Sequence, residues 1–251
     1  RGILMADFSA QVALGESLTP VGQLRFTQTG PRQFSTFTYD QKWSDNPQAF
    51  AIDPVLPLEG GPFHTSGRPG HMRDSLPGVF SDAAPDDWGR RLLERAYGNG
   101  LSEFEYLTLS DDMCRQGALR FLGADGAIIR GNAADAVPRL VELENITAIA
   151  RAYEQGKEIS AEEMQALAGA GGSGGARPKA NVRDGDALWL AKFTSVHDQR
   201  PIERVEVATL RLARACGIRT PDVRLELPDS PFPVALIERF DRRGSARIPY
   251  I

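Results

Sequence analysis

Cysteine is scarce in this chain of 251 residues, and so are lysine and long apolar runs. The two cysteines, Cys114 and Cys216, lie far apart, which excludes a CxxC metal knuckle and a dense disulfide framework. No run approaches the roughly 18 consecutive apolar residues that a membrane helix needs. The opening segment, RGILMADFSAQVALGE, lacks the long apolar stretch and cleavage site of a secretory signal. Together these absences predict a cytoplasmic protein with no membrane partner.

An excess of charge of either sign is also missing. The chain has 29 Lys and Arg against 33 Asp and Glu, a net charge of −4 with a pI near 5.5. Proteins that coat nucleic acid carry a strong basic excess, so this balance argues against direct binding of DNA or RNA. Of the basic residues, 25 are arginine, and the four lysines are Lys42, Lys157, Lys179 and Lys192. Each retained lysine is therefore a candidate for a specific role.

The first third of the chain has the pattern of antiparallel β-structure. Apolar and polar residues alternate in ADFSAQVAL, VGQLRFTQTG and RQFSTFTYD, and turn residues separate these runs. Residues 45–82 are rich in Pro, Gly, Ser and Asp, which predicts one long loop. That loop contains His64 and His71, but no acidic or cysteine companions at ligand spacing, so it does not predict a metal site. Further along, GALRFLGADGAIIR predicts a hairpin turning at Asp125-Gly126.

Three helices are predicted between these strands and the last third. The segment PDDWGRRLLERAYGNG has Pro85 for the first turn, acidic residues at its start and Gly98 at its end. The segments VPRLVELENITAIARAYEQG and SAEEMQALAGA are the other two. The last of them begins with a capping box, in which Ser160 and Glu163 satisfy each other's backbone amides.

The last ninety residues follow an informative order of elements. A Gly-rich stretch, AGAGGSGGARPKA, leads into two short strands around Asp184-Gly185, and the second strand, LWLAKF, carries Lys192. A helix over PIERVEVATLRLARACG follows, and then the strands VRLEL and PVALIERF. The helix has one apolar stripe at helical spacing, made of Val205, Ala208, Leu212 and Ala215.

This order matches what the ATP-binding lobe of a kinase requires. A Gly-rich turn lets backbone N–H groups approach phosphates, a strand lysine neutralises their charge, and a helix glutamate holds that lysine. Lys192 is the strand lysine, and Glu203 and Glu206 lie on the following helix. Each feature alone has a plain alternative: the glycines as a linker, Glu206 as a solvated side chain, Glu238 as an ion-pair partner of Arg239 or Arg242. A Walker A loop is a poor fit, because Pro178-Lys179 does not complete its pattern.

At these residues the chain resembles the HipA family of serine/threonine kinases, the toxins of bacterial toxin–antitoxin modules. The motifs that carry the resemblance are GGARPKA, the LWLAKF strand, the VEVATLRLARACGI helix and the ERFDRR stretch. In the N-terminal half, VGQLRF, LPGVFSDAAPDDWGRRLLERA and GALRF resemble the β-rich N-terminal subdomain of that family. The resemblance implies an α+β fold with a β-rich subdomain at 1–132 and a protein-kinase-like N-lobe, an antiparallel sheet plus helix, at 133–251.

The resemblance also implies roles for individual residues. The phosphate-side loop is matched by Gly174, Gly175, Ala176, Arg177, Pro178 and Lys179. Lys192 matches the ATP-contacting strand lysine and Glu206 its helix partner, while Glu238, Arg239 and Phe240 match the hinge that holds adenine. Family members are regulated by autophosphorylation of a serine in or beside the Gly-rich loop, and Ser173 is the only serine within that loop. A phosphate there would place negative charge where the nucleotide phosphates belong.

The expected activity is transfer of the ATP γ-phosphate, with Mg, to a serine of a protein target. In the family that target is a translation component such as an aminoacyl-tRNA synthetase, and a HipB-like helix-turn-helix antitoxin neutralises the toxin, so that DNA contact is indirect. The family's catalytic and metal-binding residues follow the hinge, so the catalytic Asp is expected after residue 251 and the 251-residue chain alone is expected to be inactive. Two alternatives stay open: a non-catalytic interaction module that binds a kinase subunit in trans, and a small-molecule kinase with the same lobe. Lys192 and the Gly-rich loop disfavour the first.

Overall fold

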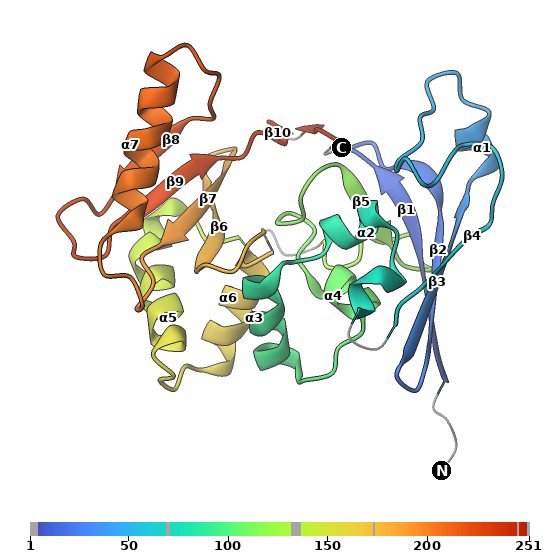
Figure 1. Ribbon diagram of the computed structural model, residues 1–251, viewed down its shortest axis with the longest axis horizontal. Helices are drawn as coiled ribbons and strands as arrows, with labels where there is room; N and C mark the ends of the chain where they lie inside the picture. The colour runs from blue at the N-terminus through green and yellow to red at the C-terminus, as the bar shows by residue number, and fades with distance from the viewer. Residues whose placement is uncertain (1–4, 69–70, 132–136, 173, 245, 250–251) are drawn as a thin grey trace. The chain divides into compact units, whose positions relative to one another are not determined.

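A computed structural model describes residues 5–68, 71–131, 137–172, 174–244 and 246–249 (Figure 1). The chain forms two compact units, each built from more than one segment. The first unit contains residues 1–84, 99–132 and 246–251, and the second contains residues 85–98 and 133–245. The helix expected at 85–97 therefore belongs to the second unit, although its sequence lies within the first predicted domain. Among the described residues, no helix has both the length and the apolar character to cross a membrane.

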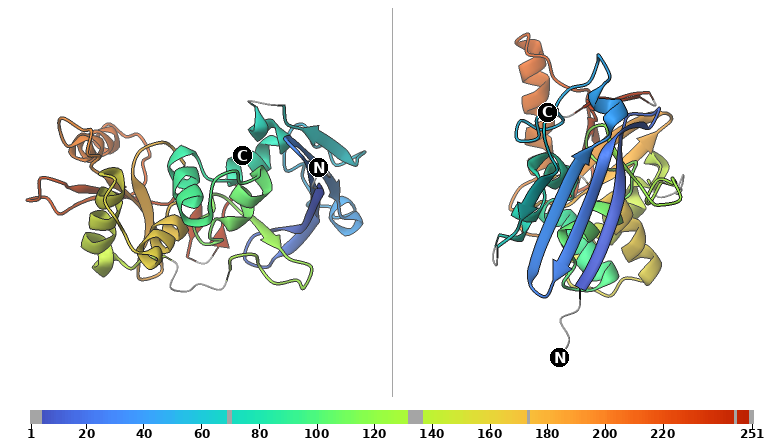
Figure 2. Two further views of the ribbon diagram at one scale, coloured as in Figure 1. Left: turned by 90° about the horizontal axis from the view of Figure 1, so that it is seen from below. Right: turned by 90° about the vertical axis from the view of Figure 1, so that its right-hand side faces the viewer.

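The first unit is built on a five-stranded antiparallel sheet with the order β4-β3-β2-β1-β5. Figure 2 shows β1, β2 and β3 as long neighbouring strands. The strands are β1 (Met5–Leu14), β2 (Thr19–Thr29), β3 (Arg32–Tyr39), β4 (Phe63–Ser66) and β5 (Leu119–Leu122). The remaining elements are α1 (Gln41–Ser44), η1 (Met72–Ser75), α2 (Gly78–Ala83), α4 (Glu103–Leu109) and β11 (Ala246–Arg247). Alternating residues of β2 are buried, and Leu24, Phe26, Phe37 and Phe80 are central to the core.

The prediction of one long loop at 45–82 was wrong, because this segment contains β4, η1 and α2. Its polar residues serve short elements: the Asp53 carboxylate accepts hydrogen bonds from the backbone N–H groups of Val55 and Val79. The predicted hairpin at 117–130 is present as β5, a turn and a single bridge between Leu122 and Ile128, with the Ile129 N–H donating to the Phe121 carbonyl. Its turn is as expected, since Gly126 has a φ of +76°. β5 also pairs with β1, which covers an edge of the sheet.

The second unit is built on a four-stranded antiparallel sheet with the order β6-β7-β9-β8. Its strands are β6 (Lys179–Asp184), β7 (Ala187–Phe193), β8 (Val223–Glu226) and β9 (Val234–Glu238), followed by β10 (Arg242–Arg243). Its helices are α3 (Asp87–Tyr97), η2 (Leu140–Glu142), α5 (Leu143–Glu154), α6 (Ala161–Ala170) and α7 (Ile202–Ala215). Helix α7 packs against β8 and β9, whereas α5 and α6 contact the opposite edge strand, β6 (Figure 1).

The buried face of α7 differs from the apolar stripe read in its sequence. Val205 and Leu212 of that stripe are 54% and 65% exposed, whereas Glu203 and Val207 are each 2% exposed. Polar contacts made by Glu203 and Glu206 toward the sheet fix the rotation of the helix. The apolar stripe of α7 therefore did not predict its buried face, because the polar partners of Glu203 and Glu206 decide which side of the helix faces inward.

The capping box of α6 is present as predicted. The Ser160 hydroxyl accepts from the Glu163 backbone N–H at 3.1 Å, and the Glu163 carboxylate accepts from the Ser160 N–H at 2.7 Å. We expect Ser160→Ala to lower the free energy of unfolding by about 1 kcal/mol, the usual cost of a lost N-cap. Urea unfolding measures this, with Ser9→Ala on the exposed side of β1 as a control. An unchanged midpoint would contradict a stabilising role for the cap.

Candidate functional site

The Gly-rich turn lies immediately before β6 in the second unit. Gly175 adopts a φ of +100°, a conformation that other residues rarely take, and a Cβ at this position would lie 2.9 Å from the Nζ atom of Lys179. The turn thus has a positional need for glycine, since the positive φ is strained for any residue that has a Cβ. This favours a functional turn over the linker interpretation. Ser173, the predicted autophosphorylation residue, lies outside the described residues.

Two lysines meet on neighbouring strands beside this turn. Lys179 begins β6 and is directly opposite Lys192 of β7 in the antiparallel register. The Lys192 ammonium forms an ion pair with the Glu206 carboxylate of α7, so Glu206 is not simply a solvated side chain. The Lys192 ammonium is paired directly with Glu206, whereas Asp86 acts on Lys179 only through its electrostatic field, so the Lys179 ammonium can still take an anion such as phosphate.

Lys179 is a buried lysine whose pKa is shifted. It is only 3% exposed, and in the part of the chain that the structure describes no carboxylate lies within salt-bridge distance of its Nζ atom. Burial, and secondarily the charge of Lys192, lowers its pKa to about 8. A buried ammonium with an incomplete set of counter-charges is a hallmark of a ligand-binding position rather than of a structural pair.

Helix α3 supports the Gly-rich turn from the other side. The Asp86 carboxylate accepts from the Gly175 backbone N–H at 2.6 Å, and the Arg91 guanidinium donates to the Ala176 carbonyl at 2.9 Å. The Trp88 indole N–H donates to the Lys179 carbonyl at 2.8 Å. Gly89 allows α3 to approach the end of α6, because a Cβ there would lie 2.7 Å from the Gly171 carbonyl oxygen. These contacts were not predicted, since nothing in PDDWGRR reveals a partner almost ninety residues away.

The Arg177 guanidinium is paired with two carboxylates. Its two terminal nitrogens contact the Asp198 carboxylate, at 3.0 and 2.5 Å, and one of them also contacts Glu203 at 3.2 Å. Beside this pair lies a hollow of about 800 Å³ lined by Trp88, Arg91, Tyr153, Glu154, Ala176, Arg177, Pro178, Ser195 and His197. Sequence reasoning missed Asp198 because its partner, Arg177, is distant along the chain.

The predicted hinge residues follow β9. The backbone N–H groups of Glu238 and Arg239 already donate to the carbonyls of Asp222 and Leu188. The Arg239 side chain is buried, where it contacts Asp241 at 2.9 and 2.5 Å and Asn181 at 2.9 Å. Asp241, not Glu238, is therefore the acid that pairs with Arg239 and Arg242. Phe240 is 64% exposed.

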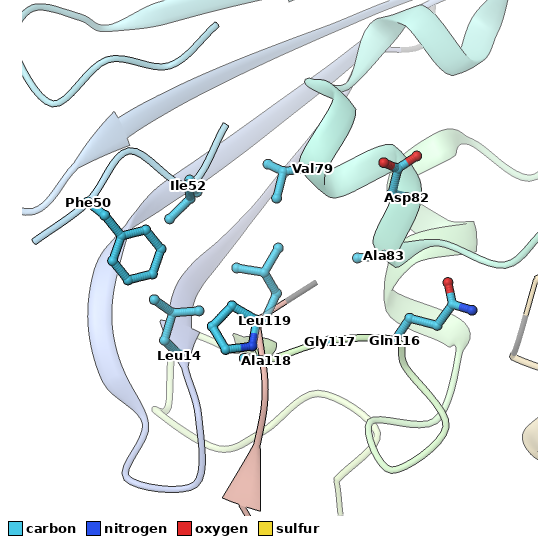
Figure 3. A pocket seen from close by; sticks show the side chains of 11 residues that line it. Leu14, Phe50, Ile52, Val79, Asp82, Ala83, Gln116, Gly117, Ala118 and Leu119 are labelled. Carbon is cyan, nitrogen blue, oxygen red and sulfur yellow. The ribbon is translucent and has the colours of Figure 1, made fainter. Parts of the chain in front are cut away.

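The first unit has a separate hollow with about 410 Å³ of empty space (Figure 3). Phe50, Ile52 and Val79 supply apolar side chains on one side, and Asp82 and Gln116 supply polar ends on the other. Pro249 of the C-terminal segment also lines it. The described residues contain no group of three or more His, Cys, Asp or Glu side chains suited to a metal ion. The lysine pair of the second unit is accordingly the better candidate for chemistry.

An antiparallel sheet with a Gly-rich turn, a strand lysine and a helix glutamate paired to it defines a protein-kinase-like N-lobe in an α+β fold. The comparisons with known protein families agree. Residues 10–121 match the HipA N-terminal domain, and residues 171–251 match the HipA-like C-terminal domain. The chain belongs to the HipA family. No curated protein matches the sequence.

Proposed function

We propose that this chain is the nucleotide-binding part of a HipA-like serine/threonine protein kinase. The observation that carries the proposal is the ion pair between Lys192 and Glu206 beside the buried Lys179 and the Gly-rich turn. ATP is the ligand that fits this charge pattern, because its phosphates supply the negative charge that the lysines lack. Mg would enter with the nucleotide, bound to its phosphates.

Each residue of the site has its own role in the proposed binding of the nucleotide. Gly175 keeps the turn free of side-chain bulk, while Lys179 and Lys192 neutralise the phosphate oxygens. Glu206 orients the Lys192 ammonium, which prevents the long side chain from adopting unproductive rotamers. At the proposed hinge, the backbone N–H groups of Glu238 and Arg239 are both used within the unit, so neither would be available to adenine.

Within the same proposal, the complete kinase transfers the ATP γ-phosphate to a serine of a protein target, a translation component such as an aminoacyl-tRNA synthetase. A HipB-like helix-turn-helix antitoxin restrains it. Membership of the HipA family supports this part, since both family domains are matched. Phosphorylation of Ser173 would oppose nucleotide binding by adding negative charge to the Gly-rich stretch that is proposed to approach the nucleotide phosphates.

Nucleotide binding by Lys192 variants tests the proposal. We expect Lys192→Met to weaken ATP binding about thirtyfold, because a charge-assisted contact worth roughly 2 kcal/mol is lost. Titration calorimetry of the chain with ATP measures this directly. Lys157→Met, an exposed lysine between α5 and α6, is the matched control and should bind like the parent.

Two results would contradict the proposal: equal ATP affinity of Lys192→Met and the parent, or no ATP binding by the parent. Either one favours the alternative of a non-catalytic interaction module, which has no use for the lysine pair. Glu206→Gln adds a finer check. It should weaken ATP binding less than Lys192→Met does, since the lysine charge remains while its orientation is lost.

A further inference from the structure

The Arg177 guanidinium connects the end of the Gly-rich turn with the segment between β7 and α7 and with the first turn of α7. It forms a two-point contact with Asp198 and a third contact with Glu203. Two-point arginine–carboxylate pairs are strong and geometrically specific, because the planar fork matches the two carboxylate oxygens. The hydrogen bond to Asp198 raises the pKa of Arg177, and the same bond lowers the pKa of Asp198. Arg177 and Asp198 therefore stay charged and paired throughout the physiological pH range.

The two acids in turn hold the elements around the site. The Asp198 carboxylate accepts from the Ser195 backbone N–H at 2.9 Å, and Glu203 accepts from the Thr194 hydroxyl at 2.9 Å. Thr194 directly follows β7, the strand that carries Lys192. The Glu203 side chain is 2% exposed in the first turn of α7. Arg177 thus ties the end of the Gly-rich turn to the segment after β7 and to the start of α7.

This arrangement bears on the Lys192–Glu206 pair. Glu203 and Glu206 are three residues apart on α7, so they share one face of the helix. When Glu203 is held by Arg177 and Thr194, the rotation of α7 that directs Glu206 to Lys192 is fixed as well. Most of the donor capacity of Arg177 is meanwhile used on carboxylates, which leaves it poorly placed to serve as a phosphate ligand.

We infer that Arg177, Asp198 and Glu203 form a positioning clamp: Arg177 acts on the nucleotide through Asp198 and Glu203, by fixing the Gly-rich turn and α7, rather than by contacting phosphate. This inference rests on the proposed function. It gives Arg177 a role different from that of Lys179, although the two residues belong to the same loop motif.

A double-mutant cycle separates the two roles of Arg177. For a clamp, Arg177→Met and Asp198→Asn each weaken ATP binding about tenfold, and the double variant is no worse than either single one. Arg177→Lys, which keeps the charge but loses the fork, should recover part of the affinity. For a phosphate ligand, Asp198→Asn would leave ATP affinity equal or higher, because it frees the guanidinium, and the clamp would be refuted. Arg211→Met, on the exposed side of α7, is the control.

Amide hydrogen exchange without nucleotide gives a second, independent readout. Loss of the clamp should accelerate exchange in both residues 174–178 and the first turn of α7 in Arg177→Met and Asp198→Asn, but not in Arg211→Met. Unchanged exchange in both segments overturns the inference even if the parent binds no ATP, in which case the proposed function fails separately. Circular dichroism melts confirm that each variant is folded. Asp198→Asn, which preserves side-chain size and leaves a 46% exposed Arg177 side chain that water can solvate, is the variant least prone to misfolding.

Discussion

Asp112→Asn is expected to destabilise the first unit by about 3–5 kcal/mol, the range typical for removing one partner from a buried ion pair. Asp112 is completely buried, and its carboxylate contacts three guanidinium groups. Arg115 lies at 3.0 Å, Arg120 at 2.6 Å and Arg247 at 2.6 Å. The substitution keeps the side-chain volume, so its effect isolates the charge. Without that charge, three cations repel one another at low dielectric.

Denaturant unfolding of the first unit measures this loss. Asp125→Asn is the control, because the exposed Asp125 caps the turn before Ala127 and asparagine supports the same turn; we expect a change below about 0.5 kcal/mol. A loss below about 1 kcal/mol for Asp112→Asn would contradict the structural role of this carboxylate among the three guanidinium groups.

Arg247 of the Asp112 cluster also attaches the C-terminal segment to the first unit. Arg247 belongs to the segment that follows the predicted hinge, and it also donates to the Asp112 carbonyl at 2.8 Å. Two residues later, Pro249 lines the same apolar hollow as Leu14 and Ala83 of this unit. The first unit thus receives the segment after residue 245 through one charged and one apolar contact. Helix α3 shows the opposite arrangement. Its sequence lies in the first half of the chain, but the helix belongs to the second unit and supports the Gly-rich turn there.

Local sequence patterns predicted the elements of this chain well. Alternation in the first three strands, the caps of α6 and the order of elements after residue 170 all correspond to the structure. These features depend on neighbours a few residues apart, where period and turn chemistry are decisive. The order of elements predicted a glutamate of the following helix, Glu203 or Glu206, as the partner of Lys192, and the family resemblance implied Glu206. The structure pairs Lys192 with Glu206.

Polar contacts between residues far apart in the chain could not be predicted from the sequence. Arg177 appeared as one more residue of a phosphate loop, yet its side chain is directed by Asp198 and Glu203. Likewise, Arg239 was assigned to the hinge, but its guanidinium is buried against Asp241 and Asn181. Arginine side chains reach far and pair with whichever carboxylate the fold brings near. Spacing along the chain carries little information about that choice.

ATP affinity is expected to fall as the pH rises through 8, because Lys179 then loses its charge. Its pKa is lowered to about 8, first by burial and then by the charge of Lys192. Below pH 8 the ammonium is present and binds phosphate; above it, each pH unit lowers the affinity up to about tenfold until the pKa of the bound state is reached. Binding therefore takes up a proton near pH 8–9. Calorimetry in buffers of different ionisation enthalpy measures that uptake.

Lys179→Met should weaken ATP binding about a hundredfold at pH 7, by loss of a contact worth roughly 2.7 kcal/mol, and it should remove the pH dependence. The stability of the nucleotide-free protein must move in the opposite direction. The unfolded chain holds the Lys179 proton up to its ordinary pKa of 10.5, whereas the folded chain releases it near 8. The unfolded state thus binds more protons between these values, so the free energy of unfolding rises with pH in that window. Lys157→Met, an exposed lysine, should change neither quantity. Nucleotide affinity and apo stability that rise or fall together across pH 8–10 would show that Lys179 is not the titrating phosphate ligand.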